Sequence, residues 1–283
     1  YRVNKPRGIL LSYYFELEQA HHWSFGGENL GDELDSHARF QFKNLWKVDL
    51  VFDRNFNTID TRVLRGGPSL RIDNHSQGEI FVQTNSSKNL FFGAGYELTR
   101  FDEKISKEDE YTFYAYWLIN NRLSLSSHTM FTTGIDNSQY ILQKSINSKR
   151  EYIVGKLDRK TLSSTIRAEL FVTPEFSLQY YGNPYASTGK FLDYRKVDDS
   201  KSKYLNRRYT PLSVAYDQQY VVDENNNPVI SLSSANPDFN FQEFRSNFVA
   251  RWEYKTGSTL YFVWTNNRSR YESIYEPSVV NSL

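Results

Sequence analysis

Alternation of apolar and polar residues is the dominant pattern along the chain. In SYYFELE, residues 12–18, the apolar side chains Tyr13, Phe15 and Leu17 occupy every second position. Successive side chains of an extended strand point to opposite faces, so this spacing predicts a strand with one apolar and one polar face. The same spacing predicts about eleven strands, in the segments 12–18, 37–43, 46–53, 80–84, 90–98, 111–119, 123–131, 162–172, 176–180, 244–254 and 260–264.

Charged residues of these segments fall on the polar face. They are Glu16, Glu18, Arg39, Lys43, Lys47, Asp49, Glu79, Glu97, Arg167, Glu169, Arg245, Arg251 and Glu253. A soluble sheet and a membrane β-barrel both show alternation, but an Arg or Lys in the middle of a lipid-facing band costs about 2–4 kcal/mol. The absence of charge from the middle of every apolar face therefore favours a barrel whose apolar face contacts lipid.

Connections between the predicted strands alternate between short and long. Short turns are expected near residues 44–45, 85–88, 120–122, 173–175 and 255–257, and the longest connections are 54–78, 134–160 and 184–242. Outer-membrane barrels have short periplasmic turns and long extracellular loops. The pattern predicts an all-β, antiparallel, transmembrane outer-membrane β-barrel in which those three connections are extracellular loops.

Composition narrows the range of functions. The chain has 283 residues, 34 basic and 33 acidic residues, no cysteine, and 16% aromatic residues. The balanced charge argues against nucleic-acid binding, and the lack of cysteine excludes disulfides and thiolate chemistry. No run of 18 apolar residues is present, which excludes a transmembrane helix. A mean hydropathy of −0.64 suits either a soluble protein or a barrel with a polar lumen.

We interpret residues 1–283 as a single, incomplete barrel domain. The first residue is Tyr1, and the only methionine is Met130, which is typical of a mature or truncated piece. An even-numbered barrel cannot close with eleven strands. The full protein is therefore expected to contain at least 12 strands, with at least one strand after residue 268.

Four segments resemble a known family in order and spacing. They are HWSFGGENLG (22–31), TRVLRGGPSL (61–70), DRKTLSSTIRAELFVTPEFSLQYYGNPY (158–185) and FNFQEFRSNFVARWEYKTGSTLYFVWT (239–265). Together they resemble the C-terminal region of Bacteroidota outer-membrane proteins classified as a domain of unknown function. In that family a periplasmic module resembling family-9 carbohydrate-binding domains precedes the barrel. The resemblance implies an outer-membrane barrel and supplies no reaction.

The segment TRVLRGGPSLR, residues 61–71, is the first candidate site because Arg62, Arg65 and Arg71 surround a Gly-Gly-Pro bend. Adjacent glycines followed by Pro68 do not fit the phosphate-binding loop of nucleotide-binding enzymes, which precedes a helix. Three interpretations stay open. The arginines could pair with lumen carboxylates such as Asp49, Asp53 or Glu97, contact an anion or solute, or dock a protein.

A network of charges in the lumen is the second candidate site. Its members are Glu16, Glu18, Arg39, Asp49, Glu97, Arg167, Glu169 and Arg251. Arg39 is expected to neutralise Glu16 and Glu18 from the next strand. No catalytic triad, nucleophile motif or metal-ligand spacing accompanies these residues. We therefore predict no catalytic residue, no metal and no cofactor.

The leading functional hypothesis is a non-enzymatic outer-membrane barrel that passes or captures a solute, with glycan-derived solutes as one class. The expected partners are outer-membrane lipid and other outer-membrane or periplasmic proteins, and nucleic acid is not expected. One alternative is a membrane anchor or subunit of a larger outer-membrane assembly, with the Tyr-rich segment 184–242 as a protein contact. Another is a soluble β-fold protein that acts on carbohydrate.

Overall fold

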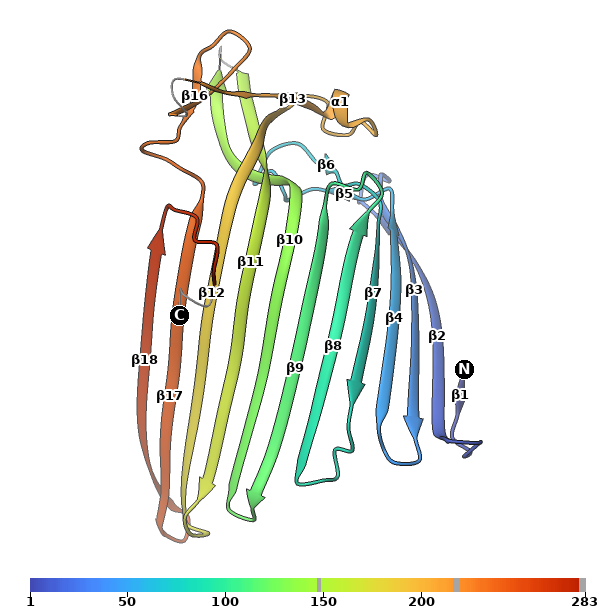
Figure 1. Ribbon diagram of the computed structural model, residues 1–283, viewed down its shortest axis with the longest axis vertical. Helices are drawn as coiled ribbons and strands as arrows, with labels where there is room; N and C mark the ends of the chain where they lie inside the picture. Colours follow the sequence, from blue (N-terminus) through green and yellow to red (C-terminus); the bar gives the residue numbers. More distant parts are fainter. Residues whose placement is uncertain (147–148, 216–218, 280–283) are drawn as a thin grey trace.

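A single large antiparallel sheet forms most of the molecule (Figure 1). The computed structural model describes residues 1–146, 149–215 and 219–279. The long strands are β2 (Leu10–Trp23), β3 (Asn29–Phe42), β4 (Lys47–Phe56), β7 (His75–Gln83), β8 (Leu90–Phe101), β9 (Lys107–Asn120), β10 (Leu123–Ile146), β11 (Lys149–Phe171), β12 (Phe176–Val197), β17 (Phe239–Lys255) and β18 (Ser258–Glu272). Each of the predicted segments lies in one of them, to within one residue at either end, which confirms the all-β antiparallel prediction.

The remaining elements are short. They are β1 (Arg2–Val3), β5 (Ile59–Asp60), β6 (Leu70–Arg71), α1 (Leu205–Arg208), β13 (Tyr209–Pro211), β14 (Ser213–Ala215), β15 (Tyr220–Val222) and β16 (Pro228–Ser231). The main sheet has the order β1-β2-β3-β4-β7-β8-β9-β10-β11-β12-β17-β18, with β13 paired to β12. Within the described residues β1 and β18 are the two edges and do not pair with each other, so the sheet is not closed.

The two faces of the sheet differ in chemistry, and the strand register shows this directly. One row of directly opposed residues crosses eight strands as Phe15, Ala38, Leu50, Ile80, Tyr96, Tyr111, Phe131 and Leu162. We call this side the apolar face. On β9 the side chains of Tyr111, Phe113 and Trp117 on this face are 51%, 49% and 47% exposed. Large exposed apolar surfaces of this kind mark contact with lipid or with another protein.

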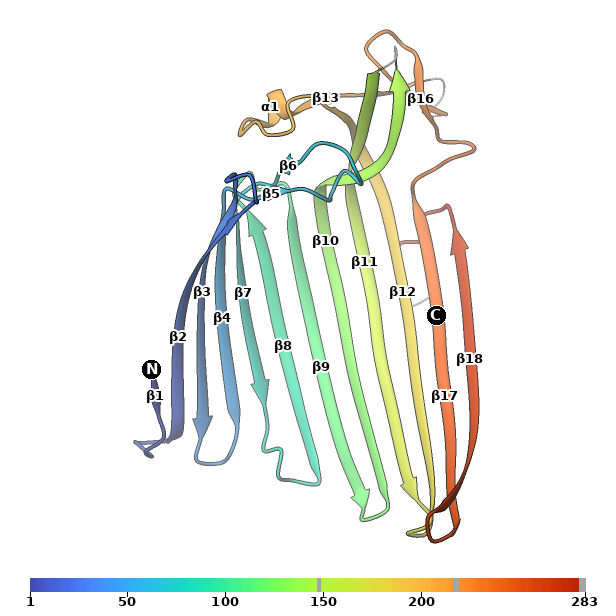
Figure 2. The same cartoon turned by 180° about the vertical axis from the view of Figure 1, so that it is seen from behind.

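The buried apolar core lies almost entirely at one end of the sheet, away from the short turns. We call this part the cap; it comprises the described residues of 57–74, 136–157 and 190–238. One cluster contains Leu64, Leu70, Tyr152, Val154, Val197 and Tyr209. A second contains Ile153, Leu157, Phe191, Tyr194, Val221, Val229 and Ile230. Figure 2 shows the cap segments gathered above the strand ends. The cap thus contains most of the buried apolar side chains of the described residues.

The long connections differ from the sequence prediction. Most of 134–160 is strand, because β10 continues to Ile146 and β11 begins at Lys149. Residues 147–148 lie outside the described part. Segment 184–242 is likewise shortened, because β12 runs to Val197 and β17 begins at Phe239; its residues 216–218 are not among those described. Segment 54–78 loses residues at both ends to β4 and β7.

These strand extensions lack the alternation that identified the rest. The pairing of β10 with β11 shifts register between Asp136 and Gln139 and again between Tyr140 and Leu142. Each irregularity inserts an extra residue and moves the following side chains to the other face. In the cap both faces of the hairpin are also covered, so a period of two is no longer expected there.

Candidate functional site

The polar face of the sheet carries two adjacent rows rich in carboxylates. One row of opposed residues reads Glu16, His37, Val51, Glu79, Glu97, Glu110 and Thr132, and the next reads Glu18, Asp35, Asp53, Gln77, Thr99, Glu108 and Gly134. Glu79, Glu97 and Glu110 are directly opposed on three successive strands and are partly buried. Like charges directly opposite each other destabilise a sheet, so this arrangement is not explained by strand pairing. We call these two rows the acidic wall.

Below the acidic wall, toward the short turns, the carboxylate of Asp49 is neutralised. Arg39 Nε lies 2.6 Å from Asp49 Oδ1, and His37 Nε2 lies 2.9 Å from the same atom. Arg39 therefore pairs with Asp49. It does not pair with Glu16 or Glu18, which was the prediction from the sequence. The Glu16 carboxylate instead accepts a hydrogen bond from the hydroxyl of Tyr14.

The other predicted lumen residues are spread over the second half of the sheet. Arg251 pairs with Glu253 at 3.0 Å on β17, and the Arg167 guanidinium lies 5.5 Å from the centre of the Tyr181 ring. Among the described residues, Glu18, Glu97 and Glu169 take part in no ion pair. The structure thus places all eight predicted network residues on one face but divides them into separate groups.

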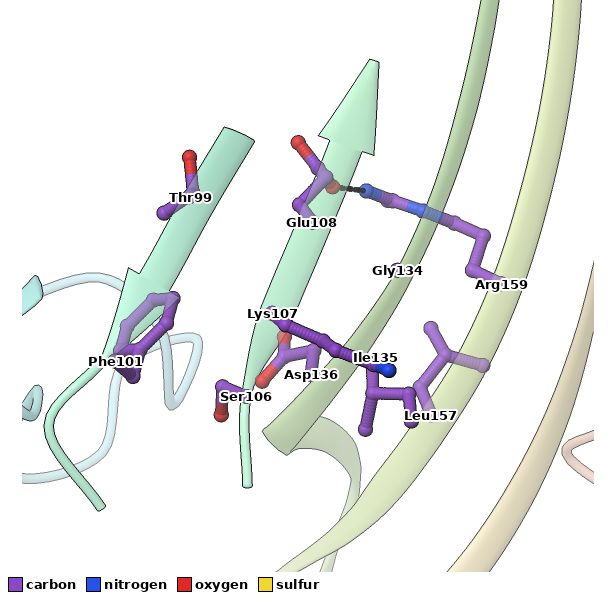
Figure 3. A pocket seen from close by; sticks show the side chains of 10 residues that line it. All are labelled: Thr99, Phe101, Ser106, Lys107, Glu108, Gly134, Ile135, Asp136, Leu157 and Arg159. Carbon is purple, nitrogen blue, oxygen red and sulfur yellow. Dashed lines mark hydrogen bonds and ion pairs between the residues drawn. The ribbon is translucent and has the colours of Figure 1, made fainter. Parts of the chain in front are cut away.

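A small cavity lies where the acidic wall meets the cap (Figure 3). Its volume is about 190 Å³, and Arg159 Nη2 lies 3.0 Å from Glu108 Oε2 across it. Gly134 stands between these residues in the sheet, opposite both. A Cβ at Gly134 would lie 2.9 Å from the Lys107 carbonyl oxygen and 3.2 Å from Glu108 Cγ, so the glycine leaves room for the side chains from either side to meet. This volume is below the range of about 300–1,000 Å³ that is typical of ligand pockets.

The loop that contains Arg62, Arg65 and Arg71 is part of the cap. Leu64 and Leu70 are fully buried in its core, and each such burial contributes about 1.5–3 kcal/mol. Gly66 has a φ of +94°, which favours glycine. A Cβ at Gly67 would lie 2.5 Å from Tyr152 Cε1. The Gly-Gly-Pro bend therefore serves both the backbone turn and the close approach of an aromatic ring.

The three arginines have different surroundings. The Arg65 guanidinium lies 5.1 Å from the centre of the Tyr140 ring, and Arg71 Nε donates to the Lys201 carbonyl oxygen at 3.0 Å. Arg62 is exposed, and its backbone N–H donates to Asp60 Oδ1. Among the described residues none of the three pairs with a carboxylate of the polar face, so the suggested pairing with Asp49, Asp53 or Glu97 is not what the structure contains. Contact with a solute or a protein stays a prediction.

A family model for a domain of unknown function, DUF5916, matches residues 1–283. The chain belongs to the DUF5916 family. No curated protein and no solved structure matches it. The match confirms that a family of unknown function spans the whole chain, whereas the outer-membrane assignment and the upstream carbohydrate-binding module stay predictions. Any function of this DUF5916 chain must therefore be argued from its own geometry.

Two further observations bear on the kinds of site this DUF5916 chain contains. Among the described residues no group of three or more His, Cys, Asp or Glu side chains is placed to hold a metal ion. No helix in the described part is both long and apolar enough to cross a membrane.

The most deeply buried charge was not found from the sequence. Arg208 of α1 is 0% exposed, and its Nη1 and Nη2 each lie 3.0 Å from an oxygen of Asp73. Its Nη1 also donates to the Arg71 carbonyl oxygen and its Nε to that of Ser202. A buried guanidinium needs such complete pairing. The partners are 135 residues apart in sequence, so no local signal connects them.

Glu103 lies beside this ion pair in the connection between β8 and β9. Burial, with the nearby carboxylate of Asp73, raises the pKa of Glu103 to about 7, although Arg208 opposes the shift. A carboxyl whose pKa is raised by folding stabilises the folded state below its unfolded pKa, and this stabilisation is lost as the pH rises through the folded pKa. The contact between this connection and the rest of the cap is therefore expected to weaken between about pH 5 and pH 8.

We expect Glu103→Gln to remove this pH dependence, because the amide does not ionise. Hydrogen exchange of residues 102–106, corrected for the intrinsic effect of pH, should show protection falling from pH 5 to pH 8 in the wild-type chain and constant protection in the variant. Equal pH dependence in both chains would contradict the assignment of the shift to Glu103.

We expect Gly67→Ala to detach the loop at 57–74 from the cap, because the added Cβ overlaps the Tyr152 ring. Trypsin cleavage after Arg62 and Arg65 should then become faster by about tenfold. Gly26→Ala is the control, since its Cβ would meet only Ser24 Oγ, at 3.7 Å. Equal cleavage in the two variants would show that the contact with Tyr152 does not hold the loop.

Proposed function

We propose that the chain is the membrane-spanning part of a bacterial outer-membrane β-barrel that passes or captures a small polar solute. The observation that carries this proposal is the apolar face. Its outward positions on β4, β8, β9, β11 and β17 hold no charged residue along segments 46–52, 90–98, 111–119, 162–170 and 244–252. A strand that crosses a bilayer needs about 9–11 residues, and the segments on β8, β9, β11 and β17 match that length.

The distribution of the core supports the same proposal. A soluble antiparallel sheet covers at least one face with a packed core, but here the buried apolar residues concentrate in the cap. Exposed aromatic side chains lie toward the strand ends, as in Trp46, Trp117 and Tyr254. Interfacial aromatic girdles of membrane barrels have this placement. The soluble carbohydrate-active alternative would need a further partner over the apolar face.

Passage or capture is supported by the acidic wall, which offers a polar surface on the opposite side of the same strands. A charged wall raises the local concentration of solutes of opposite charge. The small cavity at Glu108 and Arg159 adds polar groups of both signs near the cap.

A second candidate function is supported by the cap itself. Its own buried core and the three-stranded sheet β14-β15-β16 form a structured surface at one end of the barrel. Such a surface suits an anchor or a subunit of a larger outer-membrane assembly.

Two measurements on the full-length protein test these proposals. A protein that stays monodisperse without detergent would contradict the membrane barrel. If the protein requires detergent, conductance in planar bilayers separates passage from anchoring. We expect discrete conductance steps. A correctly inserted barrel that conducts no current would contradict passage and favour the anchor function.

A further inference from the structure

The connection between β12 and β13 folds into a separate hairpin-like loop, which we call the flap, residues 198–208. Its two ends meet where Val197 pairs with Tyr209 at the end of β12. Asp198 N–H donates to the Arg208 carbonyl oxygen at 2.9 Å, and Asp199 N–H donates to that of Arg207 at 3.2 Å. Both ends therefore leave from one point, which is the geometry of an Ω-loop.

The tip of the flap reaches elements on the other side of the sheet. Arg71 N–H donates to the Ser200 carbonyl oxygen at 2.8 Å, and Lys201 Nζ lies 2.5 Å from Glu28 Oε1 in the connection between β2 and β3. At the base of the flap, beside the Val197–Tyr209 pair, the Arg208 side chain bonds Asp73, just before β7. Since β12 is five places from β7 in the sheet order and seven from β3, the flap bridges the end of the sheet. Figures 1 and 2 show α1 above the ends of the middle strands.

The contacts that hold the tip are mainly polar. The loop at 57–74 is anchored by the buried side chains of Leu64 and Leu70, whereas the flap contributes only the partly buried Leu205 to that apolar cluster. Hydrogen bonds at a surface and exposed ion pairs such as Lys201–Glu28 add little net stability, because water competes for the same groups. Segments held in this way open more readily than a packed core. The Arg208–Asp73 ion pair differs from these contacts because it is buried, and it is the main attachment of the flap.

A large open cavity lies along the seam between the flap and the strand connections. It is lined on the flap side by Tyr204 and Leu205, and on the other side by Asp73 and Glu103. Movement of the flap about its hinge would widen this seam and uncover the end of the sheet next to the acidic wall.

From this geometry we propose that the flap is a hinged gate over one end of the barrel, and that Arg208 is the latch that holds it closed on Asp73. The role of the flap as a gate rests on the proposed barrel function. The opening of the flap and the role of Arg208 do not depend on it. When the latch is released, the flap swings about the β12–β13 pair while the rest of the cap keeps its apolar core.

The first test compares native and locked flaps in the full-length protein. The chain has no cysteine, so the double variant R71C/S200C can form a single engineered disulfide between backbones that already hydrogen-bond. We expect flap amides in the native protein to exchange hydrogen at least about tenfold faster than in the oxidised variant, with the rate restored by reduction. Equal rates in the native and oxidised proteins would show that the flap does not open, and would overturn the proposal.

The second test concerns the latch. Arg208→Met removes the guanidinium and keeps the side-chain length. Arg207→Met is its matched control, because the Arg207 guanidinium lies over the exposed Tyr204 ring and not in a buried ion pair. With Thr99→Cys as a reporter on the polar face, we expect a bulky water-soluble maleimide to label the Arg208→Met chain at least about tenfold faster than the control. Equal labelling would refute Arg208 as the latch.

The two tests are independent of passage. If the flap opens under the control of Arg208 but no current crosses the planar bilayer, the flap proposal is supported and the passage function is contradicted. If the barrel conducts but the exchange and labelling rates do not respond, passage stands and the gate fails.

Discussion

Phe113→Arg is expected to prevent stable insertion into a bilayer, whereas Thr112→Arg at the adjacent position is expected to be tolerated. Phe113 is opposed by Ala94 and Thr129 on the apolar face of β9. An arginine near the bilayer midplane costs about 2–4 kcal/mol on a lipid-facing surface, a large part of the net stability of about 5–15 kcal/mol of an average domain.

Thr112 supplies the matched control because it lies on the other face, opposite Gly95 and Met130. Glu110 lies on the same face two residues away along β9, so an arginine there gains a nearby carboxylate. The measurement is the fraction of full-length protein that folds into lipid vesicles and floats with them. Loss for both variants, or for neither, would argue against lipid contact on the apolar face.

How much of the fold follows from the sequence depends on where the strand lies. On β4 and β9 the period of two is maintained, with mostly apolar side chains on one face and mostly polar side chains on the other. Residues 46–53 and 111–119 were therefore placed correctly, together with the faces of Leu50 and Glu97.

The cap shows where this reasoning stops. Residues 134–160 continue two strands, but Gly134 and the register shifts near Gln139 interrupt the pattern. An isolated glycine within a strand marks a bulge or a close approach, and that signal was present at Gly134. No comparable signal joins Arg208 to Asp73, or Gly67 to Tyr152, since each contact depends on how distant loops meet.

The candidate site was predicted only in part for the same reason. Alternation identified Glu16, Glu18 and Glu97 as residues of one face, but the partner of Arg39 depends on register. The observed register places Arg39 directly opposite both Tyr14 and Asp49, whose carboxylate it binds, and places Glu16 opposite His37. The spacing of residues within one strand determines the face on which a side chain lies, whereas its neighbours depend on how two adjacent strands are aligned.

Replacing Glu79, Glu97 and Glu110 together by Gln is expected to reduce the preference of the full-length barrel for cations. These carboxylates are directly opposed on β7, β8 and β9 and form no ion pair within the described part of the chain. In the proposed barrel, their field would act on a passing solute. A wall of one sign can raise the local concentration of counter-ions by about tenfold or more at low salt. Neutralisation should lower the ratio of cation to anion permeability by a factor of about three to ten at low ionic strength.

The matched control removes the same charge elsewhere. Glu175, Glu224 and Glu276 lie in connections and outside the acidic wall, so their joint replacement by Gln should leave the permeability ratio nearly unchanged. The reversal potential in a salt gradient measures both variants. An equal shift in both would mean that net charge and not the wall sets the preference. Because opposed like charges destabilise strand pairing, the wall variant should also unfold at a higher denaturant concentration than the wild type. A gain in stability together with a loss of selectivity would indicate that the three glutamates serve the solute and not the fold.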